Sequence, residues 1–395
     1  MKARARAGCT AGVLLVLSLA GGAAATSRGP LSVQAWGRTK ASVPVEKVTL
    51  ANELGMRVAY VDYGATLTEI AVEDRRGHRA NVVLSLPTLL ALEQNQRRYG
   101  AEIGRYAGRI GAARFTLDGR VVRLQPNAKG VYLHADPDGY DRRVWAREDF
   151  TAADSVGSVY VMDSAAGDQG FPGRLRLEVT YRLMRHENVF RIETTATTEA
   201  PTVLNPTNHV FLNLAGAGTH GLASQRFTIA ADRYAVTDAL RIPTGELAPV
   251  AGTALDFSRP ASAQARLAGG DPLLGQPPGF DHSLLFATWD GRLRRVLRVD
   301  DLQSGRRLEV ETTEPSAQFN TGNGFDGSEV GSEGVAYQRH DGFAVETQHL
   351  PDSPNHADFP STRLAPGEVF RAVTVYRFSV ATLKSPMTSR GINAP

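Results

Sequence analysis

Six short segments of the sequence place acid, base or hydrogen-bonding side chains inside runs that otherwise read as strands. Glu346 is flanked by apolar residues, and such neighbours desolvate a carboxylate, raise its pKa and make it a usable base. His209 lies between asparagines and is followed by an apolar run. Together these two residues could transfer protons, although an isolated histidine is more often structural and a buried glutamate can simply pair with an arginine.

The other four segments supply groups that suit an oxygen-rich ligand. Glycines together with Arg105 and Arg109 allow a close backbone approach and present guanidinium donors. Asp281, in a predicted turn, and Gln318 offer further hydrogen-bonding groups, and His134 follows a glycine-containing loop. Each of these residues taken alone is also explained by a polar loop that faces solvent.

Strands would have to position these side chains, because the chain from Val45 to Val380 shows a hydrophobic period of two. In the run from Leu175 to Leu183, apolar and polar residues alternate, which is typical of a half-buried strand. Asp118-Gly119 between two strand-like runs predicts a hairpin. The only clear helical candidate, over residues 87–96, is short. Many strands separated by turns, without a fixed-period repeat, predict an all-β sandwich or barrel.

Residues 1–25 have the pattern of a secretory signal peptide. Basic residues precede a short apolar run, and three alanines at 23–25 supply a cleavage site. The apolar run is shorter than the ~20 residues of a membrane span, although an uncleaved anchor is the alternative. We therefore expect an exported protein, periplasmic or secreted. The expected divisions are a signal peptide over 1–25, a flexible lead-in over 26–41, one β domain over 42–383 and a disordered tail over 384–395.

Charge and cysteine content exclude several classes of protein. The formal net charge is +3, and the leader holds three basic and no acidic side chains, so the exported chain would have a net charge of zero. This balance argues against binding to nucleic acid or, after cleavage, to a membrane. The single cysteine, Cys9, lies in the leader, which excludes disulfides and thiolate chemistry in the rest of the chain.

No cofactor or metal is expected. Nothing in the sequence resembles a glycine-rich phosphate-binding loop followed by a helix. Histidines and carboxylates are the residues that bind zinc, but the candidates show no short, regular ligand spacing. These candidates are His134, His209, Asp281 and Glu346.

The six segments, in this order, resemble those of the galactose mutarotase (aldose 1-epimerase) family from about Ala51 to Phe378, as does the turn at residues 167–173. The resemblance implies a large antiparallel β-sandwich that holds the sugar in an open cleft. It also implies roles for the site residues: Glu346 as general base, His209 as general acid, His134 near the ring oxygen and C1 hydroxyl, and Arg109, Asp281 and Gln318 as sugar-binding residues.

The chain departs from the family pattern at two places near the site. Gly108 stands where many members have asparagine, and Ala135-Asp136 stands where many have two glycines. The loop from residue 127 to 132 also differs. These changes leave the acid and base in place and put the sugar preference in doubt.

The predicted function is aldose 1-epimerase activity, an isomerisation that interconverts the α and β anomers of free aldohexoses such as glucose and galactose. A base takes the C1 hydroxyl proton while an acid protonates the ring oxygen, and the ring opens and recloses on the other face. Glu346 would start ionised and His209 protonated, and a nearby carboxylate would raise the pKa of His209. The expected partner is a monosaccharide, and the protein is expected to be a monomer or homodimer.

Three alternative functions stay open at this stage. A sugar-phosphate epimerase of the same fold would need extra basic residues at the cleft. A non-catalytic carbohydrate-binding protein would be favoured by loss of the acid or base, and both are present. A glycoside hydrolase needs two carboxylates that flank the scissile bond, and only Glu346 and Asp281 are candidates.

Overall fold

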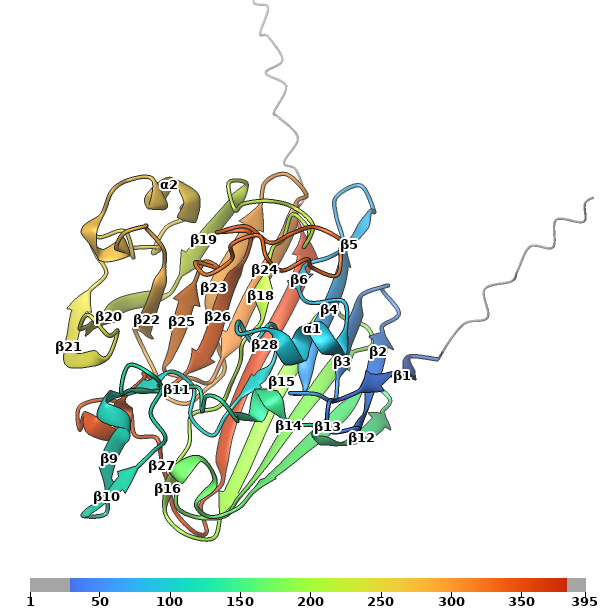
Figure 1. Cartoon of the computed structure of the whole chain (residues 1–395). Coiled ribbons are helices and arrows are strands. Elements are labelled where there is room, and N and C mark those ends of the chain that lie inside the picture. Colours follow the sequence, from blue (N-terminus) through green and yellow to red (C-terminus); the bar gives the residue numbers. More distant parts are fainter. Residues whose placement is uncertain (1–28, 382–395) are drawn as a thin grey trace, which may run out of the picture.

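The computed structural model describes residues 29–381 and shows a chain built mainly from antiparallel strands (Figure 1). The predicted signal peptide and C-terminal tail lie outside the described residues. The all-β prediction is confirmed. Alternation explains why the strands form: in β14 (Leu175–Met184) every second side chain is buried and the others are intermediate or exposed.

Three large sheets contain most of the strands. The eight-stranded sheet has the order β12 (Ala146–Thr151), β13 (Ser155–Ser164), β14, β15 (Val189–Thr198), β28 (Phe370–Val380), β24 (Arg306–Thr312), β23 (Arg294–Asp301) and β19 (Gln225–Ile229). The seven-stranded sheet has the order β21 (Pro243–Pro249), β20 (Ala231–Thr237), β22 (Asp281–Phe286), β25 (Ser316–Asn320), β26 (Phe343–Gln348), β18 (Phe211–Leu212) and β6 (Val83–Leu84). The five-stranded sheet contains, in order, β1 (Leu31–Arg38), β2 (Pro44–Ala51), β3 (Arg57–Val61), β4 (Thr66–Glu73) and β5 (Arg79–Asn81).

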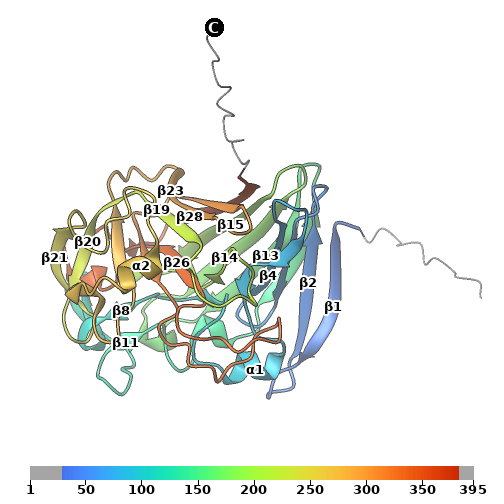
Figure 2. The same ribbon diagram turned by 90° about the horizontal axis from the view of Figure 1, so that it is seen from above.

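One contiguous hydrophobic core joins the three sheets. It includes Val58 of β3, Val179 of β14 and Phe343 of β26, each with no exposed surface. β1 and β21 lie at opposite sides of the molecule in Figure 2. The sheets therefore pack on one another as layers of a single sandwich.

Shorter ladders and helices complete the fold. The two-stranded ladders are β7 (Glu102–Ile103) with β17 (Thr207–Asn208), β8 (Arg109–Ile110) with β11 (Tyr132–Leu133), β9 (Arg114–Leu117) with β10 (Arg120–Arg123), and β16 (Thr202–Val203) with β27 (Arg363–Leu364). The 3-10 turns are η1 (Gly111–Ala113), η2 (Tyr140–Arg142), η3 (Asp168–Gly170), η4 (Pro272–Leu274) and η5 (Ser353–Asn355). The hairpin predicted at Asp118-Gly119 is confirmed, since these residues join β9 to β10.

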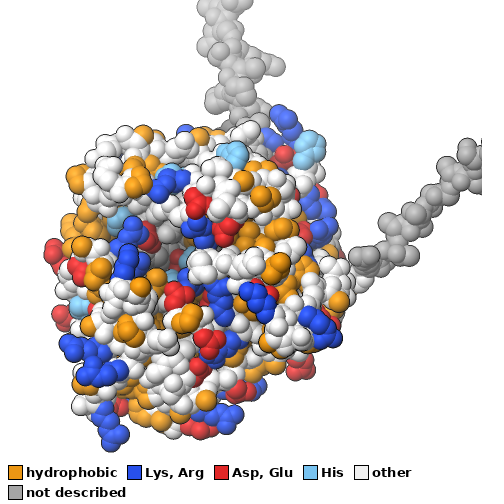
Figure 3. Space-filling view, viewed as in Figure 1, with side chains coloured by type: hydrophobic (Ala, Val, Ile, Leu, Met, Phe, Trp, Pro, Cys, Tyr) orange, Lys and Arg blue, Asp and Glu red, His pale blue; other side chains and the backbone are white. Residues whose placement is uncertain are grey.

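The helical prediction is also confirmed. The candidate over residues 87–96 forms α1 (Leu89–Gln94), and the Thr88 side chain caps it by accepting a hydrogen bond from the Ala91 N–H. A second short helix, α2 (Ala263–Leu267), was not predicted. Among residues 29–381, no helix has both the length and the hydropathy to span a membrane. On the face seen in Figure 3, basic and acidic side chains are interspersed rather than separated by sign.

The lead-in predicted over residues 26–41 is wrong at residues 31–38. These residues form β1, which pairs antiparallel with β2 from Leu31 opposite Leu50 to Arg38 opposite Pro44. The apolar residues Leu31, Val33 and Ala35 alternate with Ser32 and Gln34, a short pattern that could have indicated this strand. Backbone pairing with β2 at the sheet edge holds this strand, together with the partly buried side chains of Leu31 and Trp36, which pack against the hydrophobic core.

Candidate active site

Three adjacent strands of the seven-stranded sheet supply one wall of a cavity. Ser283 of β22 lies opposite Gln318 of β25, and Gln318 lies opposite Glu346 of β26. Residues two apart along a strand point to the same face, so each strand adds a second side chain to this wall. The lining residues from these strands are Asp281, Ser283, Gln318, Asn320, Glu346 and Gln348.

Segments from other parts of the chain complete the lining. His209 lies between β17 and β18. The Gly100 N–H donates to the His209 carbonyl, and the His209 N–H donates to the Ala101 carbonyl, both at 2.9 Å. His134 follows β11, in which Leu133 lies opposite Arg109 of β8. The cavity brings together all six residues predicted from the sequence: Glu346, His209, His134, Arg109, Asp281 and Gln318.

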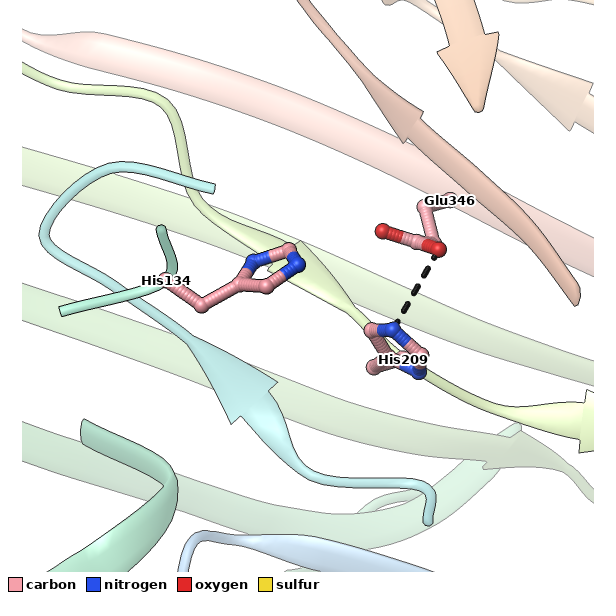
Figure 4. A group of neighbouring side chains, drawn as sticks. All are labelled: His134, His209 and Glu346. Atoms are coloured by element: carbon pink, nitrogen blue, oxygen red, sulfur yellow. Dashed lines mark ion pairs between the residues drawn. The ribbon is translucent and has the colours of Figure 1, made fainter. Parts of the chain in front are cut away.

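The acid/base side chains lie close together, as Figure 4 shows. The His209 Nε2 is 3.4 Å from the Glu346 Oε1, and potential ligand atoms of His134, His209 and Glu346 all lie within 4.8 Å of one another. The rings of His134 and His209 meet edge to face, with centroids 5.6 Å apart. The side chains of His209 and Glu346 are only 13% and 4% exposed, so water screens their interaction weakly.

Burial sets the protonation of this pair. It raises the pKa of Glu346 to about 8, although Arg109 and Arg98 oppose the shift. The expected rise in the pKa of Glu346 is therefore confirmed. Burial, with a smaller contribution from Arg98, lowers the pKa of His209 to about 4. The expectation that a carboxylate would raise the pKa of His209 is wrong, because loss of hydration and a nearby cation both disfavour the imidazolium.

Between these two pKa values the pair holds one proton in total. Neutral His209 with protonated Glu346 has the same proton count as protonated His209 with ionised Glu346. Transfer of one proton between Glu346 Oε1 and His209 Nε2 converts one form into the other. The form with a carboxylate base and an imidazolium acid is thus available without proton exchange with solvent.

The backbone selects one tautomer of His134. Its Nδ1 accepts a hydrogen bond from the Gly108 N–H at 3.2 Å, so the neutral ring carries its proton on Nε2. Burial lowers the pKa of His134 well below its ordinary value and keeps the ring neutral. Gly108 has φ +80°, and a Cβ there would lie 2.9 Å from Pro351 Cγ. A glycine at position 108 therefore allows the backbone to lie close to Pro351, in the loop after β26.

His134, His209 and Glu346 also form a set that could hold a metal ion. The sequence spacing did not reveal this set, because segments that are distant in the sequence bring the three residues together. A histidine that binds a metal normally donates its other ring N–H to an acceptor. Here His134 Nδ1 accepts a hydrogen bond, and His209 Nδ1 has no partner among the described residues. Neither histidine therefore has, among residues 29–381, the acceptor at its other ring nitrogen that usually supports a metal-bound histidine.

A hydrogen-bond chain links the predicted sugar-binding residues. The Gln318 Nε2 donates to Asp281 Oδ1 at 2.7 Å, and the Ser283 hydroxyl donates to Gln318 Oε1 at 2.6 Å. Asp281 Oδ2 also accepts from Arg241. Arg109 forms no ion pair with any residue in 29–381, so its guanidinium donors are available to a ligand.

Arg105, the first arginine of the 104–111 segment, has a structural role, and its assignment to ligand binding is wrong. Arg105 is fully buried. Its guanidinium donates to the carbonyls of Pro172 and Gly173 and to the Ser164 hydroxyl, at 2.6–2.9 Å. The turn at residues 167–173 therefore contributes to the fold as an acceptor for Arg105 and not as part of the cavity.

Several residues that line the cavity were not predicted from the sequence. Asn320 and Gln348 lie two residues after Gln318 and Glu346, so strand alternation could have found them. Arg98 and Arg241 also line the cavity. Both lie in loops and have positive φ, 54° and 61°, and no periodic pattern points to them.

Fold and site together define a β-sandwich protein with a buried proton-transfer pair in a cavity suited to a polyhydroxylated ligand. A family model described as aldose 1-epimerase matches residues 46–377. The galactose mutarotase of Rattus norvegicus is 38% identical over 338 residues, which cover 85% of this chain and 95% of that protein. The aldose 1-epimerase of Escherichia coli (strain K12) is 36% identical over 340 residues, with the same coverage.

A solved structure agrees with these relatives. The GalM/aldose epimerase homologue from C. elegans superposes with a TM-score of 0.76 and 27% identity, over 85% of this chain and 98% of that one. The chain belongs to the aldose 1-epimerase family.

Proposed function

We propose that this protein interconverts the α and β anomers of free aldohexoses, with Glu346 and His209 as its acid/base pair. The carboxylate of Glu346 takes the proton of the C1 hydroxyl, and His209 donates its proton to the ring oxygen. The C1–O5 bond then breaks to give the open-chain aldehyde. Rotation about C1–C2 and reclosure, with both protons returned, yields the other anomer.

The observation that carries this proposal is the buried Glu346–His209 contact of 3.4 Å in a polar cavity. The pair holds one proton, and mutarotation moves one proton onto the enzyme and one off it. The Nε2–H of His134 supplies a neutral donor for a sugar oxygen beside the pair. Arg109, Asp281 and Gln318 bind hydroxyls that do not react.

The cavity favours an uncharged sugar over a sugar phosphate. Three arginines line it, but Arg241 is paired with Asp281 and Arg98 with Asp136. Only Arg109 is left without an acidic partner among the described residues. The Asp281 carboxylate is likewise occupied by Arg241 and Gln318, so it is poorly placed to serve as the second catalytic carboxylate of a glycoside hydrolase.

The test is polarimetry of freshly dissolved α-glucose and α-galactose with the purified protein. The expected result is an optical rotation that relaxes to equilibrium faster than without enzyme. The Glu346→Gln variant should bind sugar but relax it at close to the uncatalysed rate. Binding without acceleration by the unmodified protein would favour the carbohydrate-binding alternative.

The proposal includes export to the periplasm or beyond the cell. Its support is the order of basic, apolar and small residues in 1–25. N-terminal sequencing of the exported protein should begin at or near Thr26. Exported material that begins at Met1 would show that residues 1–25 are not cleaved, and protein found only inside the cell would contradict export.

A further inference from the structure

Arg98 lines the cavity, although the acid/base steps above do not use it. Its side chain is 8% exposed. Its left-handed backbone, at φ 54°, is held by a hydrogen bond from its own N–H to Asn95 Oδ1 at 2.9 Å. Gly100 and Ala101, two and three residues on, exchange backbone hydrogen bonds with His209. Backbone hydrogen bonds therefore connect the segment that carries Arg98 directly to His209.

Two carboxylates hold the guanidinium. Asp136 Oδ1 accepts from Arg98 Nη2, and the buried Asp141 lies with its Oδ2 3.6 Å from Arg98 Nε. A buried cation is costly unless it is paired, so these contacts keep Arg98 in the cavity wall. Asp136 lies two residues after His134. The Arg98–Asp136 pair thus ties the His134 loop to the segment that bonds His209.

We propose that Arg98, held by Asp136, is a positioning residue that fixes the His134 loop and places a permanent positive charge beside the Glu346–His209 pair. This inference rests on the proposed epimerase chemistry. The charge favours the ionised form of Glu346, which accepts the C1 proton, and opposes a second proton on His209. The positive charge of Arg98 therefore shifts the pH range in which Glu346 and His209 together hold one proton to lower values.

Other charged groups also surround Glu346 and His209, and the effect of Arg98 on the pKa values of these two residues has to be distinguished from theirs. Arg109 favours the ionised form of Glu346, whereas Arg98 acts on both Glu346 and His209. The remaining charged or titratable groups are His134 and Asp281 with Arg241 in the lining, Asp238 near Arg109, and Asp136 and Asp141 behind Arg98. Removal of Arg98 alone should therefore move both limbs of a pH profile together.

The test is the pH dependence of kcat/KM, measured by polarimetry on one sugar. Arg98→Gln should move both limbs to higher pH by about one unit, and Arg98→Lys, which keeps the charge, should leave them near the wild type. Asp136→Asn removes the anion that offsets Arg98 and should move both limbs to lower pH. Arg97→Gln is the matched control, because Arg97 pairs with Asp326 and Glu329 outside the cavity lining, and its profile should not move.

A merely structural role for Arg98 would change kcat without these opposite shifts. Unmoved limbs in both Arg98→Gln and Asp136→Asn, with an active wild type, would overturn the inference. Thermal unfolding of each variant verifies that it folds. If Arg98→Gln does not fold, the direction of the Asp136→Asn shift decides the matter. An inactive wild type on every aldose would instead contradict the proposed function.

Discussion

Replacement of Glu346 by glutamine should stabilise the fold while it removes most of the turnover. In the folded protein the Glu346 side chain is 4% exposed and its pKa is about 8, against an ordinary value of 4.5. As the pH rises from 4.5 towards 8, the unfolded chain loses this proton while the folded protein keeps it. The free energy of unfolding therefore falls over this range and levels off above it. At 1.36 kcal/mol per pH unit, the wild type loses about 3 kcal/mol between pH 4.5 and pH 7.

Urea unfolding of wild type and Glu346→Gln at pH 5 and pH 8 measures this loss. The variant does not titrate at this position, so its stability advantage should grow by about 3 kcal/mol from the lower to the higher pH. Glu246→Gln, on an exposed position of β21, is the control and should show no such growth. In the same variant, kcat should fall by about 10²–10⁴-fold. A stability difference that is equal at both pH values would show that Glu346 is ionised in the folded protein, and the one-proton account of the pair would be wrong.

Four further outcomes follow from the same geometry. The kcat/KM of the wild type should be bell-shaped, falling below a pH of about 4 and above about 8, because the pair then gains a second proton or loses its only one; a flat profile from pH 3 to pH 10 would contradict this. His209→Asn should lower kcat by about 10²–10⁴-fold, and its combination with Glu346→Gln should cost much less than the product of the two losses, as single and double variants measured side by side will show. Asp281→Asn and Arg109→Lys should mainly raise KM, with kcat within about tenfold of the wild type, because in the proposed mechanism these residues bind hydroxyls that do not react; a loss confined to kcat would refute that assignment. Exhaustive chelation should leave activity unchanged, because His134 Nδ1 accepts a hydrogen bond from the backbone; loss with chelator and recovery with a divalent ion would reverse that conclusion.

The sequence predicted the parts of the site that depend on strand periodicity. Once β22, β25 and β26 are adjacent, a period of two brings Asp281, Gln318 and Glu346 to one face. The hairpin at Asp118-Gly119 and the helix α1 were likewise local features with local signals. The pairing order of these strands is not local, and neither the alternation nor the family resemblance, which implied only a large antiparallel β-sandwich, predicted it.

The parts that sequence reasoning missed depend on contacts between distant segments. The sequence does not distinguish Arg98 from Arg105. In the structure, however, the guanidinium of Arg105 donates to backbone carbonyls, whereas Arg98 lines the cavity. The pKa of His209 depends on how completely the surrounding segments exclude water, which no neighbour in the sequence reveals. β1 was missed although Leu31, Val33 and Ala35 alternate with polar residues, because the apolar pattern is short and its partner β2 lies at the edge of a sheet whose position the sequence does not reveal.

The one-proton pair also explains how a single site can serve both directions of the reaction. Conversion of α to β and of β to α starts from the same free enzyme, so kcat/KM in each direction depends on the same protonation state of Glu346 and His209. In the proposed mechanism, ring opening moves one proton to Glu346 and one away from His209, which leaves the pair again with one proton, now on the carboxyl group. Ring closure reverses these transfers for whichever face the aldehyde presents. The two limbs of the pH profile should therefore coincide for the α and the β anomer of one sugar, and limbs that differ between anomers would require a second acid or base.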